Sequence, residues 1–188
     1  MGRRRHSGFS IIEIMISVLI VGILVVVAIP SYKNWIQNAQ IRTAGESMVN
    51  ALQTARNEAI RRNSCVQAKL VNVPKTSWDV RLCKDAEDAS VPPLSERSHE
   101  EGSQNASVEV LPVDANMISF NALGRVVEPN PSNGSAVLTE INIRNTTMGA
   151  AEERKLRIEI PPGGGARMCD PNKAVAAADP RHCLKPDA

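Results

Sequence analysis

The chain has 188 residues, of which 43% are hydrophobic and only 3% aromatic, and its formal net charge is +2. From residue 64 onward, 14 basic side chains stand against 17 acidic ones, so this part is slightly acidic and does not indicate a broad nucleic-acid-binding surface. Beyond the N-terminal helix, two aromatic residues, Trp78 and Phe120, are too few to build the stacking platforms that bind single strands.

An apolar run extends from Phe9 to Ile29. Its 21 residues correspond to about 31 Å of helix, which matches the hydrocarbon thickness of a bilayer. One carboxylate, Glu13, lies inside the run. Its insertion costs roughly 2.5 to 3.5 kcal/mol, whereas each Ile, Leu, Val or Phe returns about 0.3 to 0.6 kcal/mol. The run holds 15 of those residues, and it therefore predicts a membrane-spanning helix over residues 9–30.

Glu13 needs a partner, because an unpaired carboxylate in hydrocarbon takes up a proton or binds a cation. Residues 9–29 contain no Lys, Arg or His. The partner must therefore come from another molecule, from lipid headgroups, or from a new amino terminus produced by cleavage nearby. Two other interpretations are a secretory signal peptide, for which the run is too long, and a single-pass anchor with an incidental glutamate. Neither explains the position of Glu13.

Three arginines at positions 3–5 precede the run and predict that the N-terminal side stays in the cytoplasm. The rest of the chain is then expected outside the inner membrane, which in a Gram-negative cell is the oxidising periplasm.

Helical signal continues after the apolar run. Pro30 is expected to kink the helix because its ring displaces a backbone hydrogen bond. Apolar residues then recur at steps of three or four, which predicts an amphipathic helix over 31–63 with its stripe against a globular head. The stripe consists of Ile41, Ala44, Met48, Leu52, Ala55 and Ala59.

Short extended segments follow, separated by Pro, Gly and Asn, and predict a β-rich head over 64–188. The expected strands lie at 65–71, 78–83, 107–112, 117–127, 137–145 and 155–161, and the charged stretch 84–105 is expected to be a solvated loop. The predicted fold class is α+β, with a long N-terminal helix packed on an antiparallel sheet.

The four cysteines allow three disulfide pairings. We favour the local one, Cys65 with Cys83 and Cys169 with Cys183, which closes two short loops worth about 3 kcal/mol each in the chain-entropy model. Metal binding is the alternative, but the chain has no CxxC and its histidines are scattered. No metal or other cofactor is therefore expected.

Residues 7–35, "SGFSIIEIMISVLIVGILVVVAIPSYKNW", resemble the N-terminal signature of type IV pilins and type II secretion pseudopilins. The resemblance implies that a prepilin peptidase removes a leader over 1–8 by cutting between Gly8 and Phe9, and then N-methylates Phe9. It also implies that Glu13 pairs with the Phe9 ammonium of a neighbouring subunit, which would make Glu13 an assembly contact.

The head segments "ARNEAIRRNSC", "ISFNALGRV" and "ARMCDP" resemble GspH/FimT-type minor pilins and pseudopilins. Here Gly124 is expected in a tight turn between two strand halves. Some DNA-uptake members carry a Gly-Arg-x-Arg element near the C-terminus, but this chain reads "GGGARMCDP". A small basic patch of Arg167, Lys173 and Arg181 remains as a possible DNA contact, and a solvated, disulfide-pinned tail is the alternative.

The leading hypothesis is a minor pilin that inserts in the inner membrane with a periplasmic head. After processing it joins other minor and major pilins in the priming or tip complex of a type IV pilus. The alternatives are a pilus-associated DNA receptor for natural transformation and a type II secretion pseudopilin. The chain shows no Ser/His/Asp order, nucleophile elbow, P-loop or metal cluster, so an enzyme is not expected.

Overall fold

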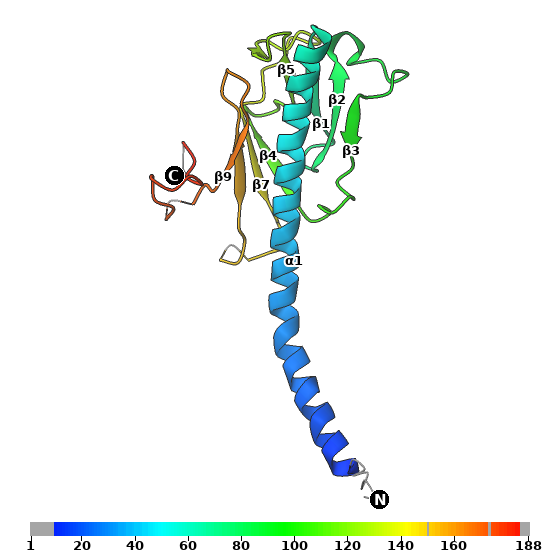
Figure 1. Cartoon of the computed structure of the whole chain (residues 1–188), viewed down its shortest axis with the longest axis vertical. Helices are drawn as coiled ribbons and strands as arrows, with labels where there is room; N and C mark the ends of the chain where they lie inside the picture. Colours follow the sequence, from blue (N-terminus) through cyan, green and yellow to red (C-terminus); the bar gives the residue numbers. More distant parts are fainter. Residues whose placement is uncertain (1–9, 150, 173, 185–188) are drawn as a thin grey trace, which may run out of the picture. The chain divides into compact units, whose positions relative to one another are not determined.

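The computed structural model describes residues 10–149, 151–172 and 174–184. The chain divides into two compact units, Met1–Ile36 and Gln37–Ala188. One helix, α1 (Ile11–Arg62), contributes its first part to one unit and its second part to the other (Figure 1).

In the first unit, α1 begins after Ser10, whose carbonyl accepts the backbone N–H groups of Glu13 and Ile14. The large apolar side chains described between Ile11 and Ile29 are all exposed, by 46% to 81%. By length and composition the helix can cross a membrane. The helical assignment continues through Pro30, and the kink at this residue stays a prediction.

In the second unit, the predicted apolar stripe is confirmed. Its six residues are at most 3% exposed: Ile41, Ala44, Met48, Leu52, Ala55 and Ala59. The 3.6-residue period of an α-helix places steps of three and four on one face, and this face is the part of α1 that enters the core.

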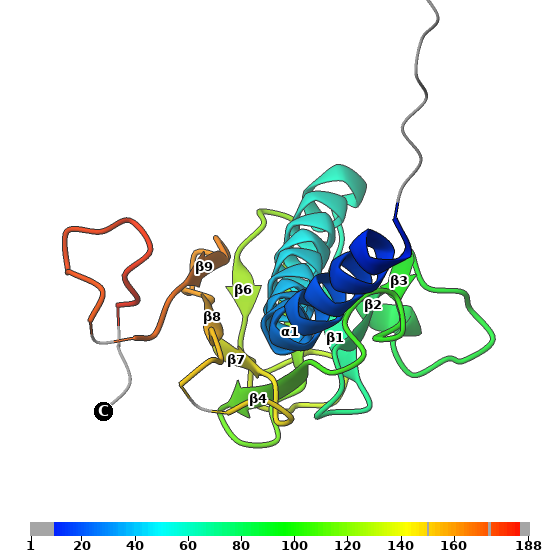
Figure 2. The same ribbon diagram turned by 90° about the horizontal axis from the view of Figure 1, so that it is seen from below.

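Two antiparallel sheets form the rest of the second unit (Figures 1 and 2). The first has the order β3-β2-β1-β5-β6, and its strands are β1 (Val66–Val71), β2 (Ser77–Leu82), β3 (Ser95–Arg97), β5 (Met117–Phe120) and β6 (Val126–Val127). The second has the order β4-β7-β8-β9, and its strands are β4 (Ser107–Leu111), β7 (Glu140–Arg144), β8 (Leu156–Glu159) and β9 (Arg167–Cys169). A short 3-10 helix, η1 (Cys83–Asp85), follows β2.

The core lies between α1 and both sheets, and each sheet supplies alternate residues to it. Strand β7 shows this clearly, because Ile141 and Ile143 are buried while the residues between and beside them are only partly covered. Gly45 allows α1 to approach the second sheet closely. A Cβ atom at this position would lie 2.7 Å from the sulfur of Met168 and 3.3 Å from Cδ1 of Ile143.

All six predicted strand segments contain a strand, so the predicted α+β class with an antiparallel β-rich head is confirmed. Segment 117–127 contains two, β5 and β6, joined by a turn in which Gly124 has φ +72° as expected. Two strands were missed. β3 lies inside the stretch 84–105, so the prediction of a loop was wrong for residues 95–97, and β9 was not anticipated. Both have three residues, too few to show an alternating pattern.

The local disulfide pairing is confirmed. Cys65 bonds to Cys83 with a Cα–Cα distance of 5.4 Å, and Cys169 bonds to Cys183 with a Cα–Cα distance of 5.1 Å. The first links the residue directly before β1 to the residue directly after β2, and the second attaches the C-terminal segment to β9.

Candidate functional site

The candidate assembly residue Glu13 lies in the first full turn of α1. Its carboxylate is exposed and forms no ion pair with any described residue. The main-chain carbonyl of Glu13 accepts a hydrogen bond from the hydroxyl of Ser17 at 2.7 Å. The Ser17 hydroxyl is therefore bonded within the helix. Gly8 and Phe9, the predicted cleavage and methylation residues, lie outside the described residues. The pairing of Glu13 with a terminal amine stays a prediction.

The surroundings of Glu13 are apolar and open. Ile12, Ile14 and Ile16 are each more than half exposed, and the large apolar residues described in the following turns are at least 46% exposed. Because water does not stabilise such a surface, this helix requires lipid or other apolar protein around it. In either surrounding an unpaired carboxylate costs several kcal/mol, so Glu13 favours a neighbour that carries a positive charge.

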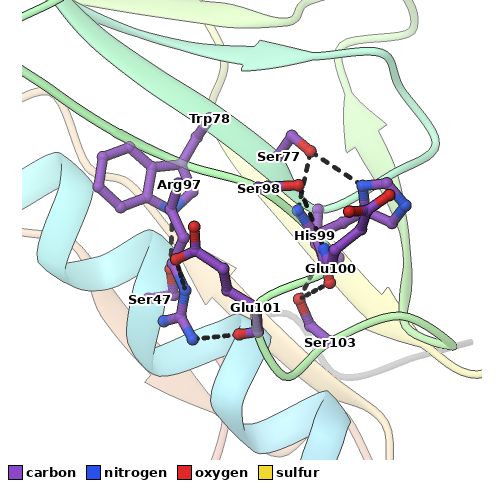
Figure 3. A network of polar contacts seen from close by, with 10 residues as sticks. Ser47, Ser77, Trp78, Arg97, Ser98, His99, Glu100, Glu101 and Ser103 are labelled. Atoms are coloured by element: carbon purple, nitrogen blue, oxygen red, sulfur yellow. Dashed lines mark hydrogen bonds and ion pairs between the residues drawn. The ribbon is translucent and has the colours of Figure 1, made fainter.

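Polar contacts attach the second part of α1 to the first sheet. The indole N–H of Trp78, on β2, donates to the hydroxyl of Ser47 at 2.7 Å, and this hydrogen bond is buried (Figure 3). Near the end of the helix, the guanidinium of Arg56 donates to the carbonyl of Gly124 at 3.0 Å. Neither contact was predicted from the sequence. Trp78 offered a signal, because a buried tryptophan usually finds an acceptor for its N–H.

The turn between β7 and β8 is attached to the same helix by Asn38. This side chain donates to the carbonyl of Glu152 at 3.0 Å and accepts the backbone N–H of Arg154 at 2.8 Å. Since Asn38 belongs to the second unit, the attachment holds the N-terminal end of the helix part that packs on the head.

The acidic loop after β3 is ordered by hydroxyl groups (Figure 3). Ser77 on β2 accepts the backbone N–H of His99 at 3.0 Å and lies 3.2 Å from its Nδ1. Ser103 donates to the carbonyl of His99 at 3.1 Å and contacts Thr76 at 2.8 Å. This part of the predicted solvated loop is therefore fixed to β2.

The two described residues of the predicted basic patch are both ion-paired. Arg167 lies 3.1 Å from a carboxylate oxygen of Glu159, and Arg181 lies 2.8 Å from one of Asp179. The side-chain and backbone hydrogen bonds from Arg181 lower the pKa of Asp179 from 3.8 to about 2. Lys173 lies outside the described residues. Each arginine therefore brings a counter-charge with it, which reduces the local attraction for phosphate.

One group of potential metal ligands occurs in the described part of the chain, formed by Glu159, Cys169 and Cys183 with ligand atoms within 4.8 Å of one another. Both sulfurs belong to the same disulfide, so neither is a thiolate that can bind a metal.

Two protein-family models match the chain. The prokaryotic N-terminal methylation motif covers residues 3–29, and Type II transport protein GspH covers residues 44–164, well over half of the chain. The chain belongs to the GspH family. This places it among the type IV minor pilins and pseudopilins, which are structural subunits and not a class of enzymes. The methylation motif overlaps the apolar first part of α1, which by length and composition can cross a membrane.

Curated relatives of this GspH-family chain include a fimbrial protein of Pseudomonas aeruginosa, 44% identical over 57 residues, or 30% of this chain and 36% of the relative. The type IV major fimbrial protein FimA of Dichelobacter nodosus is 39% identical over 63 residues, or 32% of this chain and 39% of the relative. The chain thus spans little more than a third of the length of these relatives.

Solved structures similar to the chain include two crystal forms of the type IV minor pilin FimU of Pseudomonas aeruginosa PAO1. Each is 17% identical and covers 68% of this chain, and the two TM-scores are 0.48 and 0.49. The matched regions make up 90% and 87% of the FimU chains.

Proposed function

We propose that the chain is a minor pilin of a type IV pilus. A prepilin peptidase removes residues 1–8 and methylates Phe9, the head faces the periplasm, and the subunit then enters the priming or tip complex with other minor and major pilins. In that complex the carboxylate of Glu13 pairs with the Phe9 ammonium of a neighbouring subunit.

One observation carries this proposal: an exposed carboxylate without a described partner stands in an exposed apolar helix, inside the match to the methylation motif. A carboxylate in this position only destabilises a helix that serves as a simple membrane anchor. In an assembly contact it can pair with a positive charge on a neighbouring subunit. Two further observations agree with export. Arginines 3–5 precede the span, and all four cysteines are paired in disulfides, which persist in an oxidising compartment.

The test is to replace Glu13 with Ala, Gln or Asp in the full chain and to quantify the protein in sheared pili and in membranes. We expect Glu13→Ala and Glu13→Gln to remain in the membrane, processed, while their amount in sheared pili falls at least tenfold. Glu13→Asp, which keeps the charge, should retain part of the incorporation. Ser17→Ala is the matched control, because it lies one turn further along and keeps the carboxylate.

Intact mass of the membrane-extracted protein separates the steps. Loss of residues 1–8 and gain of one methyl group must be seen in each variant, so that failed processing is not mistaken for failed assembly. Normal incorporation of processed Glu13→Ala would contradict the proposal.

A type II secretion pseudopilin is the second candidate, favoured by the match to Type II transport protein GspH. It uses the same helix and the same charge pairing in a different machine. Deletion of the gene distinguishes the two, since a minor pilin is required for surface pili, whereas a pseudopilin is required for secretion of exported proteins.

The DNA-receptor alternative has less support, because Arg167 and Arg181 are each paired with a carboxylate. Its test is retention of duplex DNA by the full chain in detergent across a salt series. Retention that falls steeply with salt would favour phosphate contacts, and no retention at low salt would remove this alternative.

A further inference from the structure

The exposed aromatic surface of the described chain is concentrated at one point. Trp78 and Phe120, in the head, are 8% and 0% exposed, whereas Tyr32 and Trp35 on α1 are 62% and 65% exposed. The two residues lie three and six positions after Ile29, the last residue of the apolar run. Both aromatic residues are visible in the sequence, but their positions after the apolar run did not by themselves indicate a role.

Tyr32 and Trp35 act as one unit. They are three residues apart and therefore lie on the same face of the helix. Their ring centroids are 5.9 Å apart and the ring planes are inclined by 25°, so the rings are stacked.

The polar ends of this pair have no acceptor or donor in the described part of the chain: no hydrogen bond forms at the tyrosine hydroxyl or the Trp35 indole N–H. The other tryptophan behaves differently, because the N–H of Trp78 donates to Ser47. The pair is therefore amphipathic, with two stacked apolar rings and two polar groups that no described residue binds. Such a pair suits the interface between an apolar region and water.

The depth along the helix agrees with the interface of a bilayer. If residues 9–29 fill about 30 Å of hydrocarbon, the backbone of Tyr32 lies about 4.5 Å and that of Trp35 about 9 Å beyond it, at about 1.5 Å per residue. Side chains on a helix point back toward its N-terminus, which brings both rings closer to the hydrocarbon boundary. Between them, the exposed ammonium of Lys33 can reach lipid phosphate.

We propose that Tyr32 and Trp35 form an interfacial anchor that binds the phospholipid headgroup region on the non-cytoplasmic side and fixes the depth of the span before the subunit enters a filament. This inference rests on the proposed function, because it requires the helix to cross the membrane. The anchor would also set the depth of Glu13, which lies 22 residues from Trp35. With Trp35 fixed at one interface, Glu13 lies near the opposite end of the hydrocarbon, where it can reach the amine of a neighbouring subunit.

The test uses the fluorescence of the full chain in vesicles of phosphatidylcholine and phosphatidylglycerol whose acyl chains carry bromine at carbons 6 and 7 or at carbons 11 and 12. The Trp35 signal is the difference between the native chain and Trp35→Phe, which leaves buried Trp78 as background. We expect the shallow bromines to quench this signal at least twofold more than the deep ones. In Tyr32→Ala this preference should weaken, whereas Ser31→Ala, an adjacent exposed position, should leave it unchanged.

Two results would contradict the interfacial anchor without affecting the proposed function. The first is a Trp35 signal that neither lipid quenches, as expected for a ring that contacts water or a neighbouring pilin helix. The second is a Trp35 signal that the deep bromines quench more than the shallow ones. Alkaline extraction of the same vesicles shows whether the chain spans the membrane at all. If the chain is released by alkali, the span itself is wrong, and both this inference and the proposed function fail. If it is retained, a negative quenching result counts only against the anchor.

Discussion

The two parts of α1 place the same kind of residue in opposite environments. Ile20 in the first part is 51% exposed and Ile41 in the second is 0% exposed, although both belong to one uninterrupted helix. In the first part apolar residues occur on every side, whereas in the second they form a single stripe. The continuous pattern indicates a helix that needs an apolar surrounding, and the periodic pattern indicates a helix that packs on its own chain.

This difference separates folding from assembly. The hydrophobic core, both disulfides and the helix-to-sheet contacts all belong to the unit Gln37–Ala188. None of the large apolar side chains described between Ile11 and Ile29 is among the residues of that core. We therefore expect substitutions in the second part of α1 to change the free energy of unfolding, and substitutions in the first part to change membrane insertion and incorporation.

The largest effect on stability is expected for Ile41→Ala. Ile41 is fully buried in the core, so removal of its side chain should lower the free energy of unfolding by about 2 to 5 kcal/mol through lost burial and the cavity left behind. The matched substitution Ile20→Ala should leave it nearly unchanged. Urea unfolding of the full chain in detergent, followed by far-UV circular dichroism, measures both. Equal losses for the two variants would mean that the first part of α1 also packs on the head.

Much of this division could be predicted from the sequence because it depends on local pattern. The length of the apolar run, the stripe from Ile41 to Ala59 and the alternation in the six longer strand segments each repeat often enough to be recognised. Four cysteines in two close pairs made the local disulfides the simplest choice. The left-handed turn at Gly124 followed from a glycine between two strand halves.

What could not be predicted depends on contacts between distant segments. Ser47 and Trp78 are separated by 31 residues, and nothing in the sequence distinguishes this serine from others on the helix. The pairing of Arg167 with Glu159 requires the register of β8 with β9, and β9 was itself missed. The partner of Arg181 is different, since Asp179 lies only two residues away and was visible in the sequence.

A smaller effect is expected when the hydrogen bond between α1 and β2 is removed. Ser47→Ala leaves the buried N–H of Trp78 without an acceptor and should cost about 1 to 3 kcal/mol of unfolding free energy. Ser17→Ala is the matched serine of the first part, where the hydroxyl is exposed and bonds only to its own helix, so it should cost nothing measurable.

A double-mutant cycle with Trp78→Phe isolates the Ser47 contact. The cost of the double variant should be smaller than the sum of the single variants by about 0.5 to 3 kcal/mol, because both remove the same bond. Strict additivity would show that the Ser47 hydroxyl does not stabilise the head through Trp78.

The smallest effect should fall on the C-terminal segment, far in sequence from both parts of α1. Hydrogen bonds from Arg181 hold the pKa of Asp179 at about 2, below the ordinary value of 3.8. Because the pKa is lowered in the folded state, the stabilisation is complete above about pH 4 and is lost as the pH falls through 2. The side chain of Arg181 is 71% exposed and that of Asp179 is 26% exposed, so solvent screens the interaction and the effect on unfolding should be slight.

Arg181→Ala removes the side-chain hydrogen bonds, the largest cause of the lowered pKa, and keeps the backbone N–H bond to Asp179. The pKa of Asp179 should therefore rise toward 3.8, as followed by the carboxyl carbon resonance in an NMR titration of the full chain in detergent micelles. Ser90→Ala is a matched control, because it removes a hydroxyl bonded to a different exposed carboxylate, Asp88, whose pKa is also lowered by that contact. It should change the titration of Asp88 and leave that of Asp179 in place. If Asp179 already titrates near 3.8 in the native chain, Arg181 is free to bind phosphate, and the DNA-receptor alternative regains the support that this ion pair removes.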